Sequence, residues 1–272
     1  MRPDAAIRFL ESDESIFRIF PAPAAPPGRW SYSTPPFSEN KFMIFRIFSL
    51  GGYHAAKLKN YQDIIDLMFA RFNRGLVPIN ILNMLNAKYI LSSYRLFGDD
   101  SPFPLVFQEE NSYIYENKGA LPRAALVGSY RVLPRERIPE MLLSREFDPA
   151  SSVLLEHEPG IAPGSTEGSS IEITDYQLNR IELRARVKEP CLLLLSEIDY
   201  PSWGASVDGE PVEILTANYC LRAIPLRPGA SEIVFRFGSK VLNKALIISV
   251  VTFVIVLAVP VVFRQAAAEK GR

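Results

Sequence analysis

The chain has 272 residues, enough for one large domain or two small ones with a sizeable core. Its 30 lysine and arginine residues equal its 30 aspartate and glutamate residues, and this balance counts against a DNA- or RNA-binding protein. Two cysteines cannot make a zinc site alone, and the sequence has no phosphate-binding glycine loop, HExxH motif or nucleophile elbow. We therefore expect no metal, no cofactor and no complete active site in this chain.

The first 157 residues predict an α+β region, because helical and strand-like patterns alternate along them. Helices are expected over residues 3–12, 55–73, 79–85 and 134–144. Strands are expected over residues 15–20, 43–50, 88–92 and 123–132, with a hairpin of 105–108 and 113–116. Residues 21–36 are rich in proline, alanine and serine and predict a loop. The helix over 55–73 has the clearest apolar face, which comprises Tyr61, Ile64, Ile65, Met68, Phe69 and Phe72.

Residues 171–240 predict a β-sandwich subdomain, whose strands could be completed from the first part of the chain. The composition of residues 158–170 is that of a flexible linker. Residues 180–187 alternate between apolar and charged side chains, which is typical of a half-buried strand. Further strands are expected over 191–195, 203–207 and 233–237, with Asp208-Gly209 as a two-residue hairpin turn.

Residues 245–263 form an apolar run without a charged side chain, interrupted only by the hydroxyls of Ser249 and Thr252. Nineteen residues at the helical rise span roughly 28 Å, about the hydrocarbon thickness of a bilayer. The sequence therefore predicts one transmembrane helix, which Pro260 would at most kink, and a short tail over residues 264–272.

The orientation of this helix does not follow from charge, because three basic residues precede the span and three follow it. A folded domain crosses the membrane largely regardless of its charge, so the side on which the tail lies follows only from the family resemblance given below. Residues 1–10 are too short and too charged for a signal peptide. If the β-domain lies outside the membrane, nothing in this chain could export it before the last helix emerges. In that case we expect the sequence to be the C-terminal fragment of a longer polytopic protein, or the product of a split gene.

Cys191 and Cys220 both lie on expected strands of one subdomain. A disulfide between them is conceivable in an oxidising compartment. The alternative, which we favour, is that both are small buried apolar residues.

Residues 51–59 (GGYHAAKLK) are the most suggestive polar stretch. Paired glycines allow a ligand to approach the backbone, and Tyr53, His54, Lys57 and Lys59 could bind hydroxyls or phosphate of an anionic lipid-linked substrate. The simpler interpretation, which we favour, is a tight turn followed by a solvated first helical turn.

Glu197, Asp199 and Asp208 lie near Trp203 in the sequence. An indole ring can stack on a sugar and carboxylates accept bonds from its hydroxyls, so Trp203 is a candidate substrate-binding residue. We favour the alternative, in which Trp203 is a core or inter-sheet residue and Asp208 serves the turn.

Four stretches resemble the YfhO-type family of bacterial membrane proteins. The C-terminal signature of that family, roughly YPGWxAxVDG followed by a PxGxHxVxFxYxP strand and a membrane helix, is similar to residues 200–209 and 228–237 here. Residues 82–91 (LNMLNAKYIL) and 115–123 (YENKGALPR) are similar to two further motifs. The chain departs from the pattern at Ser202, Ser231 and 238–239, all of which we expect at turns or strand ends.

The resemblance implies part of a GT-C-like glycosyltransferase that uses a polyprenyl-phosphate-linked sugar outside the cytoplasmic membrane. In that family the proposed catalytic acid lies in an early extracytoplasmic loop, which has no counterpart here. The expected partners are thus the bilayer, a polyprenyl-phosphate sugar, an envelope glycan and an upstream membrane-helix segment. The bulk of the chain would be extracytoplasmic and the C-terminus cytoplasmic.

Two hypotheses of different class remain. In the first, the chain contributes to transfer of sugar to a cell-envelope acceptor, with the catalytic part elsewhere. In the second, it is a membrane-anchored, non-catalytic module that binds envelope glycans or has a structural role. A soluble intracellular enzyme is a distant third, because residues 245–263 argue against it.

Overall fold

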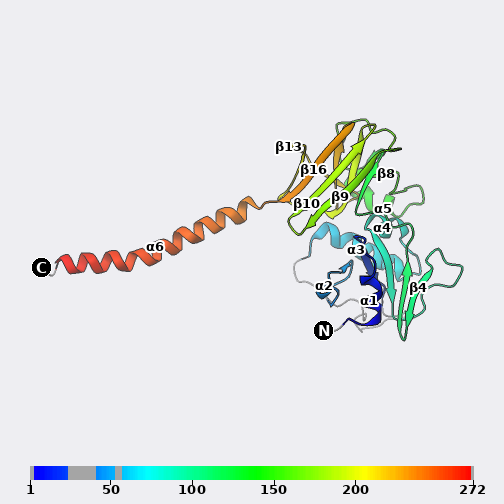
Figure 1. Ribbon diagram of the computed structural model, residues 1–272, viewed down its shortest axis with the longest axis horizontal. Helices are drawn as coiled ribbons and strands as arrows, with labels where there is room; N and C mark the ends of the chain where they lie inside the picture. The colour runs from blue at the N-terminus through cyan, green and yellow to red at the C-terminus, as the bar shows by residue number, and fades with distance from the viewer. Residues whose placement is uncertain (1–2, 24–40, 53–56, 271–272) are drawn as a thin grey trace.

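The computed structural model describes residues 3–23, 41–52 and 57–270, with side chains in the same ranges except at 41, 240–243 and 260–270. The chain forms a mixed α/β body built mostly of strands, and a long C-terminal helix, α6 (Lys240–Lys270), projects from it (Figure 1). The body contains three sheets. Helices lie between the first and second sheets, whereas the second and third sheets pack directly against each other. This architecture agrees with the α+β prediction at the level of class.

The first sheet has the strand order β2-β1-β3-β5-β4. Strand β1 pairs in parallel with its two neighbours, and the remaining pairs are antiparallel. Its strands are β1 (Arg18–Pro21), β2 (Phe48–Ser49), β3 (Ala87–Ser92), β4 (Leu105–Glu109) and β5 (Ser112–Glu116). Helix α1 (Ala5–Glu11) covers one face, where Ile7 and Leu10 pack with Ile19 and Ile114. The predicted helix at the N-terminus and the predicted hairpin are thus confirmed.

Helices α3 (Lys59–Phe72) and α4 (Ile79–Met84) cover the other face of the first sheet. In α3, Ile64, Ile65, Met68 and Phe72 are buried, which is the face that helical periodicity predicted. The helix begins four residues later than predicted, and the residues 55–56 that were included in the prediction lie outside the described residues.

The second sheet has the order β6-β11-β15-β14-β8-β7, in which only β7 and β8 are parallel. Its strands are β6 (Ala124–Val127), β7 (Ser129–Val132), β8 (Ser152–Leu155), β11 (Cys191–Ile198), β14 (Leu215–Ala217) and β15 (Leu221–Leu226). A short 3₁₀ turn, η1 (Arg135–Arg137), and α5 (Ile138–Leu142) connect β7 to β8. Half of this sheet therefore comes from residues that precede 158.

The third sheet is antiparallel throughout, with the order β13-β12-β16-β10-β9. Its strands are β9 (Ser170–Gln177), β10 (Arg180–Val187), β12 (Trp203–Val207), β13 (Glu210–Val212) and β16 (Gly229–Phe237). Asp208 and Gly209 have φ values of 51° and 86°, which confirms the predicted turn, since positive φ at both positions defines type I′.

Strand β11 explains how the layers are joined. Its residues Leu192 and Leu194 pack toward the α3 and α4 layer, whereas Cys191, Leu193 and Leu195 pack toward the third sheet. All five are at most 2 % exposed. A strand buried on both faces must be apolar at every position, and this accounts for the unbroken run CLLLL.

Several predictions about local structure were wrong. The expected strand over 43–50 is a short helix, α2 (Lys41–Ile44), followed by the two-residue β2. The expected strand over 123–132 is broken at Gly128, where a Cβ atom would lie 2.4 Å from the Gly164 carbonyl oxygen. Ser231 lies inside β16, opposite Ala185, and not at a strand end. Ser202 is at a turn as expected, with φ of 83°, a conformation that glycine adopts more readily.

Helix α6 contains the predicted span as one continuous 31-residue helix. In the part of the chain whose side chains the structure describes, which ends at residue 259, no helix is long and apolar enough to cross a membrane. The last residues of the predicted span, 260–263, lie outside that part. The apolar side chains of α6 that are described, from Leu246 to Val259, are exposed.

Candidate functional site

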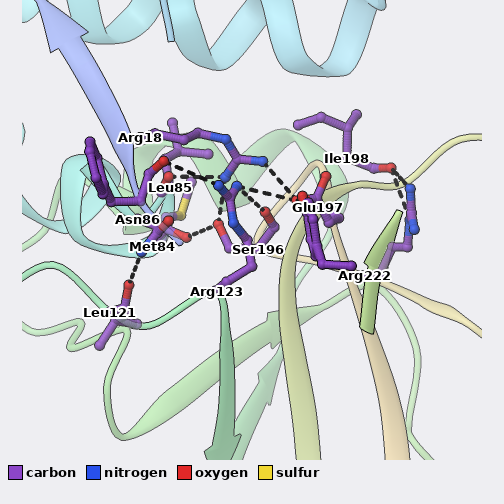
Figure 2. Close-up of polar contacts among 12 residues, drawn as sticks. Arg18, Met84, Leu85, Asn86, Leu121, Arg123, Ser196, Glu197, Ile198 and Arg222 are labelled. Carbon is purple, nitrogen blue, oxygen red and sulfur yellow. Dashed lines mark hydrogen bonds and ion pairs between the residues drawn. The ribbon is translucent and has the colours of Figure 1, made fainter. Parts of the chain in front are cut away.

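A buried ionic cluster joins the first sheet to the two others. Its centre is Glu197 near the end of β11, whose Oε1 atom lies 3.2 Å from Arg18 Nη2 and 3.2 Å from Arg123 Nη1. Tyr176 donates its hydroxyl to the same oxygen at 2.5 Å. Figure 2 shows the two arginine side chains converging on Glu197. We call Arg18, Arg123, Tyr176 and Glu197 the ionic junction.

The ionic junction draws together segments that are far apart in the sequence. Arg18 begins β1, Arg123 directly precedes β6, and Tyr176 lies near the end of β9. Arg18 Nη1 also donates to the Leu85 carbonyl at 3.1 Å and to Ser196 Oγ at 3.0 Å. The Ser196 hydroxyl in turn donates to the carbonyl of Met84 at 2.8 Å, so β11 is tied to the end of α4 (Figure 2).

The electrostatics of the junction favour a fixed ion cluster. Burial alone would raise the pKa of Glu197, but the guanidinium groups of Arg18 and Arg123 outweigh burial and hold this pKa below its usual value. Burial and the neighbouring Arg18 lower the pKa of Arg123 to about 10, so both partners stay charged at neutral pH. A carboxylate held ionised by two arginines is a poor proton donor, and the geometry therefore argues against general acid catalysis by Glu197.

A third arginine lies beside the junction. Arg222 donates from Nε and Nη2 to the carbonyl of Ile198 at 3.0 and 2.8 Å, and burial lowers its pKa to about 10. Its guanidinium lies 3.9 Å from the ring centroid of Trp203. Trp203 also packs against Phe237 and the apolar cluster between the second and third sheets. These contacts are those of an inter-sheet residue, the interpretation we favoured.

An open pocket of about 440 Å³ lies next to the junction. Arg123 and Asn86 both line it, together with Lys88, Lys118 and Phe17. Most of its wall comes from residues 86–88 and 116–123, which belong to two of the four stretches that carry the family resemblance. The remaining lining residues are Ser15, Ile16, Glu116, Asn117, Ala120, Leu121, Pro122, Ala124, Ile171 and Ile173.

These two stretches are interlocked through three asparagine residues. Asn117 donates to the side chain of Asn83 at 2.9 Å and to the carbonyl of Ala87 at 3.0 Å. Asn86 donates to the carbonyl of Leu121 at 2.8 Å (Figure 2). The asparagines therefore have a structural role that holds the pocket wall in shape.

The pocket also borders a second ion pair. Lys88 Nζ lies 2.5 Å from Asp13 Oδ2, and Tyr89 donates its hydroxyl to the same oxygen at 2.8 Å. Burial alone would raise the pKa of Asp13, but hydrogen bonds from Lys88, Ser15 and Tyr89 lower it to about 2. Asp13 neutralises Lys88, and Lys118 and Glu116 have opposite charges. Arg123 also lines the pocket, and it shares the single carboxylate of Glu197 with Arg18. The wall therefore carries charged side chains of both signs, which can bond the hydroxyl groups of a ligand.

The stretch 51–59 gives no assembled site among the described residues. Tyr53 and His54 lie outside them. Lys57 is exposed, and the exposed Lys59 lies 2.9 Å from Asp63 one helical turn onward. Gly51 makes its close approach to Pro21, since a Cβ atom there would lie 2.4 Å from Pro21 Cγ. The lack of a side chain at Gly51 therefore serves packing against Pro21, within the protein itself.

The carboxylates near Trp203 are also separated. Glu197 belongs to the ionic junction, Asp199 accepts a hydrogen bond from Thr216 at 2.5 Å, and Asp208 accepts one from the Glu232 amide at 2.7 Å. In the described part of the chain, no three His, Cys, Asp or Glu side chains could hold a metal ion together. Cys191 and Cys220 are free and buried in different apolar clusters, so the disulfide does not form.

Sequence reasoning missed the ionic junction. Its signal is visible afterwards, because the charged Arg18 interrupts the apolar run SIFRIF and the charged Glu197 lies near the end of the apolar run CLLLLSEI. Such residues are seldom buried without a partner. No family model, curated protein or solved structure matches the chain.

Proposed function

We propose that this chain is a membrane-anchored module of the bacterial cell envelope, and that it forms the C-terminal extracytoplasmic region of a YfhO-like protein. The observation that carries the proposal is helix α6. Its described apolar side chains, from Leu246 to Val259, are each 44 to 66 % exposed. An exposed apolar surface of this extent is unfavourable in water and favourable in a lipid bilayer.

The position of α6 supports the same reading. The helix leaves the body in a direction that takes it away from all three sheets (Figure 1). The body buries its own apolar residues in three clusters without using α6. We propose that residues 245–263 span the cytoplasmic membrane, with the body outside and residues 264–272 inside.

In the proposed sugar transfer, this chain has an auxiliary role. The resemblance supports a role in sugar transfer from a polyprenyl-phosphate donor to an envelope acceptor. The ionic junction supports a non-catalytic body, because its carboxylate is held ionised between two arginines. In this proposal, the upstream membrane-helix segment of the family supplies the catalytic acid, and this module shapes the acceptor side.

One observation favours a second candidate function, non-catalytic glycan binding. The pocket combines the Lys118 and Glu116 side chains with the buried Asn86 Oδ1 atom, which accepts no hydrogen bond in the described part of the chain. Amide oxygens and charged groups bond the hydroxyls of a sugar. Saturation-transfer NMR with short N-acetylhexosamine oligosaccharides would test it. Binding should weaken in Lys118→Glu and persist in Lys188→Glu, whose side chain is not among those that line the pocket.

Membrane anchoring is tested with the full chain in vesicles, followed by an alkaline wash that removes peripheral proteins. The wild-type chain should stay with the vesicles. The double variant Val251→Arg/Val254→Arg should be washed off, because each arginine near the helix centre costs about 2.5–3.5 kcal/mol of insertion.

The matched control places the same residue type on the body. Val132 and Leu105 are 40 % and 37 % exposed on edge strands. The variant Val132→Arg/Leu105→Arg should be retained like the wild type. Loss of the wild-type chain in the wash, or equal loss of both double variants, would refute anchoring by α6.

A further inference from the structure

Three segments meet at the end of the third sheet where α6 begins. The Phe237 amide donates to the carbonyl of Asn179 in the β9–β10 turn at 2.9 Å, and the Gly238 amide donates to the Ser202 carbonyl at 2.8 Å. Helix α6 starts two residues later, at Lys240. The two turns therefore surround the point at which α6 leaves the body, as Figure 1 shows for β9, β10 and β16.

Both turns present apolar or aromatic side chains to the outside. Leu178, at the tip of the β9–β10 turn, is 93 % exposed. A leucine with this exposure makes almost no contact with the body and is free to contact another surface. Tyr200 is 43 % exposed and stacks on Phe237, with ring centroids 6.3 Å apart. Tyrosine is enriched at the level of lipid headgroups, where one end of its ring is apolar and the other is wet.

The same end of the sheet carries basic residues. Arg236 on β16 is exposed and lies directly opposite Arg180 on β10. Arg180 is paired with Glu182, whereas no ion pair of Arg236 occurs among the described residues. Like charges opposite each other on a sheet are destabilising, and a nearby anion relieves this repulsion. Lys244, one turn into α6, is exposed as well.

We infer that this end of the third sheet is a membrane-contact surface. Leu178 and Tyr200 enter the interfacial layer of the bilayer, and Arg236 and Lys244 bind the phosphates of anionic lipids. The inference rests on the proposed anchoring of α6. This anchoring holds the end of the third sheet close to the bilayer surface, because α6 begins at Lys240 and the proposed span at residue 245. The inference also predicts the orientation of the body: the end of the third sheet from which α6 leaves faces the membrane.

The test uses single cysteines labelled with an environment-sensitive fluorophore in the full chain, reconstituted in phosphatidylglycerol-containing vesicles. Leu178→Cys places the label at the proposed contact. Glu210→Cys places it beyond the Asp208-Gly209 turn, at the other end of β12, about 16 Å away along the strand. The native Cys191 and Cys220 are buried, so labelling of the introduced thiol is selective.

We expect the label at position 178 to be blue-shifted and several-fold less quenched by iodide than the label at position 210. In phosphatidylcholine vesicles, and in the Arg236→Gln variant, this difference should shrink. If the protein floats with the vesicles but both labels are quenched equally, the contact surface is refuted while the anchor stands. If the protein does not float with vesicles at all, anchoring fails and the contact surface fails with it.

Discussion

Replacing Glu197 with glutamine removes the carboxylate charge of the ionic junction and keeps its size and one oxygen acceptor. At an effective dielectric constant of about 20, a charge pair at 3.2 Å is worth about 5 kcal/mol, and Glu197 makes two such pairs. Repulsion between the two arginines and the hydrogen bonds that glutamine retains reduce the net effect. Removing one partner of a buried pair costs about 3–5 kcal/mol, and we expect Glu197→Gln to fall in this range.

The measurement is urea unfolding of the full chain in detergent micelles, followed by far-UV circular dichroism. Glu182→Gln is the matched control, because its partner Arg180 and Glu182 itself are about one-third exposed. An exposed pair contributes at most about 1 kcal/mol. Equal destabilisation by the two substitutions would refute the view that the junction is a buried structural ion cluster.

A double variant separates the loss of charge balance from any loss of packing. If the unpaired arginines cause the instability, Arg18→Met should cost less in the Glu197→Gln background than in the wild type. Strict additivity of the two substitutions would mean that Arg18 and Glu197 do not interact energetically, despite their 3.2 Å separation.

Three further predictions concern other parts of the body. Gly51→Ala should destabilise the protein by about 1–3 kcal/mol because its Cβ would overlap the Pro21 ring, whereas Gly98→Ala, which meets no atom within 4 Å, should be nearly neutral in the same unfolding assay. Burial raises the pKa of Cys191 to about 11 and that of Cys220 to about 12, so a thiol reagent at pH 8 should react with neither thiol until the protein unfolds; fast reaction of the native protein would contradict their burial. The lowered pKa of Asp13, about 2 against 3.8 in the unfolded chain, stabilises the fold above pH 4, and this contribution is lost as pH falls toward 2. Asp13→Asn should flatten the stability profile between pH 4 and 2, and an unchanged slope would show that Asp13 is not the titrating group.

The elements that could be predicted from sequence are those with a strong local pattern. The amphipathic face of α3, the alternation in β10 and the turn residues Asp208-Gly209 each reflect one local rule, and the structure agrees with all three. The apolar run at 191–195 also predicted a strand. Its burial on both faces could be established only from the structure, because a continuous apolar run does not show what packs on either side of the strand.

The parts that could not be predicted depend on contacts between distant segments. Residues 152–155 (SVLL) are too short to show a period, and they become β8 by pairing with β7 and β14. One strand was expected over residues 123–132, but it is broken at Gly128. Gly128 lies against Gly164, which is 36 residues away in the sequence. The partners of Glu197 come from positions 18, 123 and 176, and no local pattern links them.

The stretches that resemble YfhO-type proteins have structural roles that a binding motif would not need. Residues 82–91 and 115–123 interlock through Asn83, Asn86 and Asn117, and the second ends at Arg123 in the ionic junction. Residues 200–209 form the turn beside α6 and the hairpin turn of the third sheet. A resemblance carried by such residues bears on the fold before it bears on the chemistry. Substitutions that test function should therefore leave the asparagines intact and change Lys118 or Leu178, whose side chains no described hydrogen bond holds in place.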